Sequence, residues 1–248
     1  MNASGASAAT PVGKPTHPKE RLQQELEGRS IDLGGALFRR EWFAVTDRIP
    51  PLTARVRAWD LAATPEDERK SRDPDWCAGV LIGKAADRTL YVLDVRRIRG
   101  TPQQVQSLVI STAQADGAET AIVMEEEGGS SGKIVIADFA RRLCGAYDFR
   151  GIRSTGSKTT RASPLAAAAE AGLVKLARGL WNRDFLDEFE LFPYGGAPDD
   201  MVDAASLAAA RLARTEGYVA QPAELLTPGY EGPFGAGPFV GGPGTMPW

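Results

Sequence analysis

The chain has 248 residues, 43% of them hydrophobic, so it can bury one large core or two small ones. A net charge of −3 excludes a uniformly basic nucleic-acid coat, and no segment approaches the roughly 18 apolar residues of a membrane span. The only histidine, His17, excludes a His-based triad and a His-rich zinc site. Cys77 and Cys144 have no metal-ligand spacing, and their apolar surroundings predict buried thiols in a reducing compartment.

The two ends of the chain differ in composition from its centre. Residues 1–35 predict a disordered leader with a short charged helix, because the first 18 are mainly small and polar. Residues 36–53 are aromatic and predict a linker or packing strap that ends at Pro50-Pro51. We expect the folded domain to span residues 54–214. The Gly- and Pro-rich tail, residues 215–248, predicts disorder or an interaction strap.

The central segments alternate between strand and helix patterns. Strands are predicted at 55–61, 75–84 and 89–98, with an exposed loop at 64–74. A helix follows at 102–115, with Thr101 as N-cap and Pro102 at the first helical position. The later strands are predicted at 120–125, 149–154 and 173–177, and the later helices at 133–143, 164–171, 182–192 and 199–214. A three-strand meander followed by alternating helices and strands predicts an α/β fold, a mixed sheet with helices on its faces.

Acidic residues stand at the ends of three separated segments. Asp60 ends the first predicted strand and Glu125 the fourth, while Asp199, Asp200 and Asp203 open the last predicted helix. Converging carboxylates bind hard divalent cations, and two such cations can cleave a phosphodiester. Taken singly, an Asp after a strand is more often a turn residue, and acids in a first helical turn favour the helix dipole. Asp200 and Asp203 are three residues apart and share a helix face.

The positive charge is concentrated between residues 141 and 183. This stretch has nine Lys or Arg residues against two acids, Asp148 and Glu170. Such a density is in the range of a phosphate-binding patch, although an ordinary solvated surface explains it equally well.

The Gly-rich segment 128–133 joins a predicted strand to a predicted helix and ends in Lys133. A nucleotide-binding P-loop needs four residues between its glycines and a Ser or Thr after the lysine. Here three residues separate the glycines and Ile134 follows, so no ATPase motif is expected. The backbone amides of this loop can still hold a DNA phosphate at a helix N-terminus.

Several segments occur in an order that is similar to one known family. The segments are 37–43, 57–62 (Arg-Ala-Trp-Asp-Leu-Ala), 75–80, 124–133, 158–164, 179–182, 192–193 and 198–204 (Pro-Asp-Asp-Met-Val-Asp-Ala). Over residues 36–213 the chain resembles the C-terminal nuclease domain of the large terminase subunit of tailed bacteriophages, in the branch with a ribonuclease-H-like fold. Each segment is moderately specific alone, and their joint order and spacing carry the resemblance.

The resemblance implies a ribonuclease-H-like endonuclease that cuts double-stranded viral DNA concatemers during genome packaging. The family's first-strand Asp falls on Asp60, its fourth-strand acid on Glu125, and its late paired acids on Asp199 and Asp200, with Asp203 behind them. The family usually has a His before that pair. Pro198 stands there instead, so a metal or phosphate contact from that position is not expected. The family's ATPase motor has no counterpart in this chain.

The resulting hypothesis is two-metal hydrolysis. Asp60, Glu125 and Asp200, aided by Asp199 or Asp203, would bind two Mg²⁺ or Mn²⁺ ions roughly 3.5–4 Å apart. One ion would activate a water and the other would stabilise the leaving oxygen. The predicted DNA contacts are weakly sequence-specific and salt-sensitive; they come from Lys133, Arg153, Lys158 and Arg161. The expected partners are double-stranded DNA, an ATPase motor domain, the small terminase subunit and the portal, in the cytoplasm of the infected bacterial host and without a membrane.

Three alternatives remain at this stage. The first is another two-metal nuclease of the same fold, such as a junction resolvase or an exonuclease, which branched substrates would distinguish. The second is a non-catalytic module that grips DNA or docks onto a motor, with structural acids and no Mn²⁺ binding. The third is a nucleotide-binding protein that uses the loop at residues 128–133, and it requires nucleotide retained through purification.

Overall fold

A computed structural model of the chain describes residues 36–61, 76–194 and 198–214. The chain divides into two compact units, Met1–Thr215 and Glu216–Trp248, and all described residues belong to the first. The predictions for 1–35, for the loop at 64–74 and for 215–248 lie outside this part. No helix among the described residues has the length and apolar character to cross a membrane.

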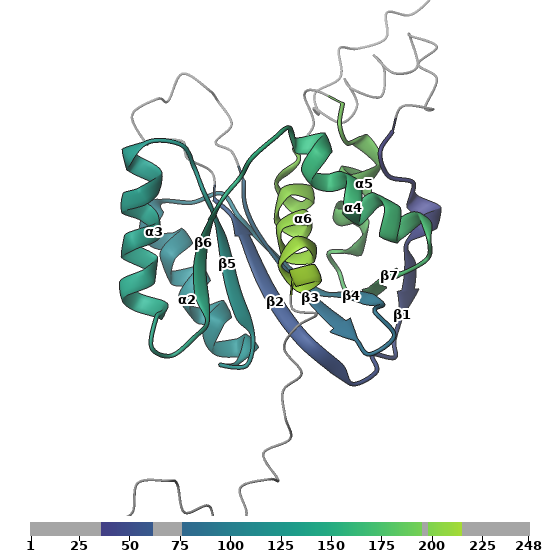
Figure 1. Cartoon of the computed structure of the whole chain (residues 1–248), viewed down its shortest axis with the longest axis horizontal. Helices are drawn as coiled ribbons and strands as arrows, with labels where there is room; N and C mark the ends of the chain where they lie inside the picture. The colour runs from purple at the N-terminus through teal and green to yellow at the C-terminus, as the bar shows by residue number, and fades with distance from the viewer. Residues whose placement is uncertain (1–35, 62–75, 195–197, 215–248) are drawn as a thin grey trace, which may run out of the picture. The chain divides into compact units, whose positions relative to one another are not determined.

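The described residues form one mixed sheet (Figure 1). Its strands, listed in chain order, are β1 (Ala44–Thr46), β2 (Leu52–Asp60), β3 (Cys77–Ala85), β4 (Leu90–Ile98), β5 (Ala121–Glu126), β6 (Phe149–Arg153) and β7 (Val174–Ala177). Their spatial order is β1-β7-β4-β3-β2-β5-β6. The meander β2-β3-β4 is antiparallel, whereas β5 and β6 extend it in parallel from β2. β2, β4 and β5 therefore all end at the same edge of the sheet.

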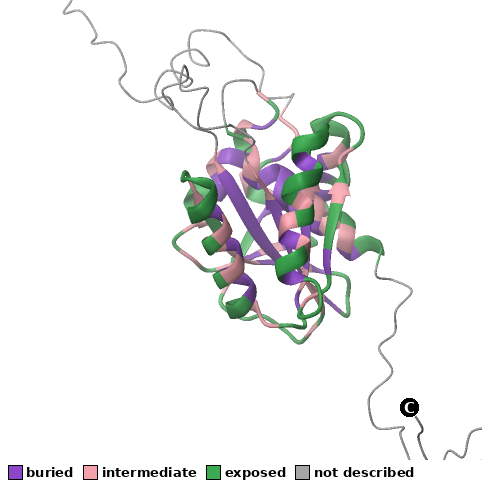
Figure 2. Cartoon of the chain, turned by 90° about the vertical axis from the view of Figure 1, so that its left-hand side faces the viewer, coloured by how far each residue is buried: buried purple, intermediate pink, exposed green. Residues whose placement is uncertain are grey.

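Helices cover both faces of the sheet. On one face lie α2 (Pro102–Asp116) and α3 (Ser130–Leu143); on the other lie α4 (Lys158–Glu170), α5 (Asn182–Leu191) and α6 (Asp200–Ala213) (Figure 1). Each face has its own apolar cluster. Figure 2 looks onto one side of the chain, where buried strands lie behind helices whose outer surfaces are exposed. The predicted mixed sheet with helices on both faces is confirmed.

The alternation of β2 and β5 decides which residues face which helices. Trp59 and Met124 pack in the cluster under α2 and α3, whereas Ala58 and Val123 pack in the cluster under α4, α5 and α6. Because successive side chains of a strand point to opposite faces, Asp60 lies on the face of Ala58, the face that α6 covers.

Helix and strand limits differ from the predictions in a few places. The predicted cap of α2 is present, since the Thr101 hydroxyl accepts a hydrogen bond from the Gln104 amide. Helix α4 begins six residues before the predicted start and contains Pro164, and α3 begins three residues early, at Ser130. Cys77 is buried as expected, but Cys144 is exposed, because it lies just past the end of α3.

The segment 36–53, predicted as a linker or strap, contributes to both the sheet and the core. It contains the short 3-10 helix η2 (Arg40–Trp42) and β1, an unpredicted strand that pairs with β7. Phe38 and Phe43 pack against Phe189 of α5, with ring centroids 4.7 and 5.5 Å from that ring.

Candidate metal-dependent nuclease site

Asp60 and Glu125 lie side by side at the carboxyl ends of neighbouring parallel strands. The last paired residues of β2 and β5 are Trp59 and Met124, so the two acids each follow by one position. Both acids share the strand face that α6 covers. The parallel pairing of two central strands thus places acids that are 65 positions apart in the chain next to each other.

The N-terminus of α6 brings the remaining acids to the same edge. α6 packs on β2, β3 and β5, and Asp200 and Asp203 occupy its first turn. The pKa of Asp60 lies well above its ordinary value because the side chain is buried and because Glu125, Asp203 and Asp200 repel its negative charge. Burial likewise raises the pKa of Asp200 to about 6, although Arg97 opposes the shift. These acids form one electrostatic unit that favours the arrival of positive charge.

Two basic side chains of α4 lie against this acidic group. Lys158 Nζ is 2.7 Å from Asp199 Oδ1 and 2.9 Å from Asp203 Oδ2. Arg161 Nη2 is 2.8 Å from Asp203 Oδ1 and 3.6 Å from Glu125 Oε1. Burial alone would lower the pKa of Lys158, but its hydrogen bonds to Asp199 and Asp203 raise the pKa above the ordinary value. Lys158 and Arg161, which the sequence predicts as DNA contacts, therefore lie directly against the predicted metal ligands.

The donor chemistry of this group suits Mg²⁺ or Mn²⁺, because its ligands would be carboxylate oxygens. In residues 36–61, 76–194 and 198–214, however, no three acids, histidines or cysteines are already grouped as ligands of one ion. Both oxygens of the buried Asp203 carboxylate accept contacts from Lys158 and Arg161. Asp60, Glu125 and Asp200 are therefore better placed than Asp203 to hold a cation.

The two other predicted DNA contacts lie on exposed surface. Lys133 is in the first turn of α3, and its side chain is exposed. Arg153 ends the edge strand β6, where its Nε donates a hydrogen bond to Glu126 at 2.9 Å. Glu126 is therefore an ion-pair partner of Arg153.

Two residues at the site were not predicted from the sequence. Arg97, at the end of β4, lies 3.7 Å from Asp200 and 3.0 Å from Glu188 of α5. Glu188 also accepts a hydrogen bond from the Met201 amide at 2.6 Å. Burial raises the pKa of Glu188 to about 7, against the opposing effects of Arg97 and the Met201 amide. A sequence signal existed, because Glu188 is three residues after Phe185 and four before Phe192, an apolar helical spacing.

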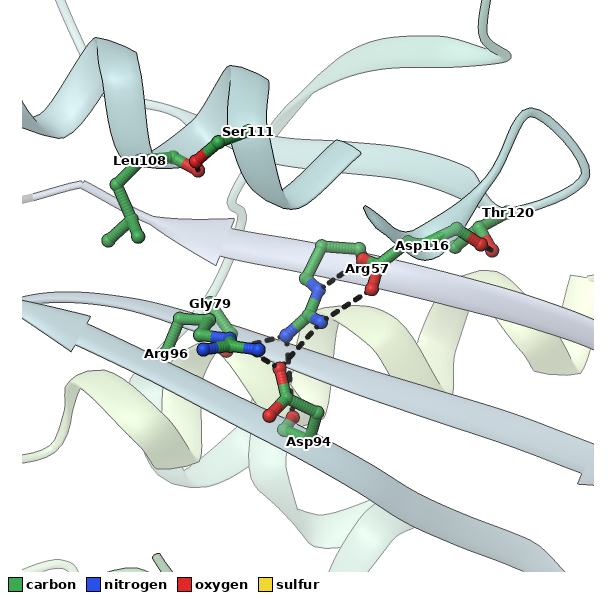
Figure 3. A network of polar contacts seen from close by, with 8 residues as sticks. All are labelled: Arg57, Gly79, Asp94, Arg96, Leu108, Ser111, Asp116 and Thr120. Carbon is green, nitrogen blue, oxygen red and sulfur yellow. Dashed lines mark hydrogen bonds and ion pairs between the residues drawn. The ribbon is translucent and has the colours of Figure 1, made fainter. Parts of the chain in front are cut away.

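A second polar network lies on the opposite face of β2 (Figure 3). Arg57 is 1% exposed, and its guanidinium donates to both oxygens of Asp116 at 2.7 and 2.9 Å. It also donates to an Asp94 carboxylate oxygen at 2.8 Å and to the Gly79 carbonyl at 3.1 Å. Arg57 therefore fastens β2 to α2, β3 and β4, three residues before Asp60.

A comparison with known protein families identifies the family of this chain. Residues 57–212 match the model of a family described as the terminase RNaseH-like domain. The chain belongs to this family. All five predicted acids of this terminase domain fall within the matched residues, as do the predicted DNA contacts and the basic stretch. The resemblance noted in the sequence is thereby confirmed, and so is the ribonuclease-H-like fold class.

Solved structures similar to this terminase domain support the fold. The large terminase nuclease of thermophilic phage G20c is 13% identical with a TM-score of 0.50, and the match covers 71% of this chain and 98% of that one. The large terminase of another thermophilic bacteriophage is 11% identical with a TM-score of 0.51, over 71% of this chain and 43% of that one. The G20c nuclease has also been crystallised with bound magnesium; that structure is 15% identical with a TM-score of 0.48, over 72% and 96% of the two chains. No curated protein sequence matches.

Proposed function

We propose that this terminase domain is a metal-dependent endonuclease that cleaves double-stranded viral DNA concatemers during genome packaging. The observation that carries the proposal is the meeting of Asp60, Glu125 and the first turn of α6 at one edge of the sheet. The raised pKa of Asp60, caused by burial and by three neighbouring acids, supports a site built to receive cations.

The proposed roles of the carboxylates follow from their positions. The charge of Asp60 interacts both with Glu125 on β5 and with Asp200 on α6, so Asp60 would be the ligand that two Mg²⁺ or Mn²⁺ ions share. Two such ions supply an activated water and stabilise the leaving oxygen of the phosphodiester. Glu125 and Asp200 complete the ligand set from either side, with Asp199 as an auxiliary ligand.

Lys158 and Arg161 have a double role in this proposal. Their charges hold Asp203 and steady the start of α6, and they also present positive charge where a DNA phosphate would approach. Arg153 and Lys133 extend this positive surface along the duplex. Phosphate contacts of this kind carry no base information, so cleavage should be weakly sequence-specific and salt-sensitive.

The assembly proposed around this domain is that of a packaging machine. Its partners would be double-stranded DNA, an ATPase motor domain, the small terminase subunit and the portal. The site of action would be the cytoplasm of the infected bacterial host, where the DNA is packaged.

Substitution of Asp60 tests the proposal. We expect wild-type protein to nick and linearise supercoiled plasmid in Mn²⁺, and Asp60→Asn to lower the rate at least about 100-fold, because a shared ligand is lost. Asp87→Asn is the matched control, since Asp87 lies in the β3–β4 turn at the opposite end of β3 and its carboxylate accepts hydrogen bonds from Thr89. A folded Asp60→Asn protein that cuts like wild type would remove the proposal.

A further inference from the structure

The start of α6 is capped by a residue from another helix. The first backbone N–H groups of a helix have no partner inside it, and a side-chain oxygen usually accepts one of them. Asp199 holds the N-cap position of α6 but makes no capping hydrogen bond, and its carboxylate binds Lys158 instead. The Met201 amide donates to Glu188 Oε1, 2.6 Å away on α5. Glu188 therefore takes the capping role that Asp199 does not fill.

The second oxygen of Glu188 lies beside a cation that is close to Asp200. Arg97 Nη2 is 3.0 Å from Glu188 Oε2 and 3.7 Å from Asp200 Oδ2. The guanidinium also lies over the Trp76 ring, 4.4 Å from its centroid. Among the described residues, its Nε and Nη2 atoms are buried without a hydrogen bond of good geometry. Charge and stacking hold Arg97 between two acids, with Glu188 the nearer of the two and Asp200 still within ion-pair distance.

We infer that Glu188 is a positioning residue of the nuclease site: it caps α6 and, as the nearer partner of Arg97, limits how far Arg97 neutralises Asp200. The inference rests on the proposed function, because Asp200 matters as a ligand only if the site binds metal. The Glu188 side chain is 4% exposed, and its two oxygens face Arg97 and the Met201 amide, so it acts through Arg97 and the α6 backbone.

The electrostatic consequence can be separated from a merely structural one. When Glu188 loses its charge, Asp200 becomes the acid that attracts Arg97, and Arg97 then competes with the metal ion. Removing the charge of Arg97 as well ends that competition. If substitution of Arg97 restores cleavage in a Glu188 variant, the two residues act as a pair. If the two substitutions cause independent structural losses, their effects on cleavage would add.

The test compares Glu188→Gln, Arg97→Met and the double variant in plasmid cleavage with increasing Mn²⁺, in alkaline buffer. Gln retains an oxygen for the Met201 amide, and Met replaces Arg97 with an unbranched side chain that carries no charge. We expect Glu188→Gln to raise the Mn²⁺ concentration for half-maximal cleavage about tenfold, with a smaller change in kcat at saturation. The double variant should return to within about threefold of wild type. Glu190→Gln is the control, because Glu190 pairs with Arg40 on the exposed side of α5.

An unchanged metal dependence in Glu188→Gln overturns the inference, and so does a double variant that needs as much Mn²⁺ as the single one. If the single variant does not fold, the double variant must still fold and cut with the metal dependence of wild type, because its charges are balanced. Hydrogen exchange tests the cap separately: Glu188→Ala should speed exchange of the Met201 amide at least about tenfold, and unaltered protection refutes the cap. Failure of the proposed function would instead appear in wild-type protein, as no cleavage and no Mn²⁺ binding.

Discussion

At the scale of single residues, the burial of the Asp60 and Asp200 carboxylates opposes folding. An ionised carboxylate that is buried among other carboxylates is destabilised. For this reason the pKa of Asp200 is raised to about 6. Native protein then binds more protons than unfolded protein between about pH 4 and 6, so the free energy of unfolding falls as pH rises through this window. Above that window the destabilisation is complete.

Removal of this charge should therefore stabilise the metal-free protein. In EDTA at about pH 7, we expect Asp200→Asn to raise the free energy of unfolding by up to about 3 kcal/mol, and the gain should vanish near pH 4. Denaturant unfolding at the two pH values measures it. Asp87→Asn should show no gain, because a hydrogen bond from Thr89 lowers the pKa of Asp87. A destabilised Asp200→Asn protein at neutral pH would contradict the argument.

The same scale shows which site residues the sequence could predict. Asp60, Glu125 and Asp200 end or begin regular segments, so the sequence pattern offered them as candidates and the family resemblance selected them. Arg97 and Glu188 matter because β4 and α5 happen to end near α6, and this proximity has no local signature. The partners of Lys158 likewise depend on how α4 packs on α6.

At the scale of elements, tertiary contacts moved the helix boundaries. Proline usually marks a helix start, yet α4 begins at Lys158, where Ser157 caps it by accepting from the Thr160 amide at 3.1 Å. The ion pairs of Lys158 and Arg161 with α6 add contacts that offset the bond lost at Pro164. The sequence predicts a mixed sheet but not the order of its strands. The short strand β1, for example, has three residues and pairs with β7, a strand 130 positions later in the chain.

The turn between β5 and α3 depends on one glycine. A Cβ at Gly132 would lie 2.3 Å from the Glu127 carbonyl oxygen, whereas one at Gly128 would meet nothing within 4 Å. We expect Gly132→Ala to lower the free energy of unfolding by about 1–3 kcal/mol and to slow cleavage, because the turn follows Glu125 closely. Gly128→Ala should change stability by less than about 1 kcal/mol. Thermal unfolding measures the stability of both variants. Equal stabilities of Gly132→Ala and Gly128→Ala would exclude a steric conflict at Gly132.

The Arg57 network offers a matched pair on one strand (Figure 3). Arg57→Met leaves Asp116 and Asp94 without their buried partner, and we expect a loss of about 3–5 kcal/mol. Arg55, two residues earlier, pairs with the exposed Glu119, so Arg55→Met should lose no more than about 1 kcal/mol. Urea unfolding measures both. Similar losses in the two variants would mean that Arg57 is not a special anchor.

At the scale of the whole described domain, the two faces of the sheet have different tasks. The face under α2 and α3 contains the Arg57 network and anchors β2. The face under α4, α5 and α6 ends in the acid group and carries the candidate chemistry. β2 thus connects the face with the Arg57 network to the face where the carboxylates gather.

This division predicts that divalent metal stabilises the domain through one edge. At Mn²⁺ concentrations about 100 times Kd, binding to the native state adds about 2.7 kcal/mol, which corresponds to a rise in Tm of about 5–10 °C. Asp60→Asn should lose most of this rise, because the charge of Asp60 interacts with acids of both β5 and α6. Asp87→Asn should retain it, and EDTA should reverse it in both proteins that bind metal. If Mn²⁺ raises the Tm of Asp60→Asn as much as that of the wild-type protein, the ions bind elsewhere on the surface. Metal binding would then not depend on the acids at this edge.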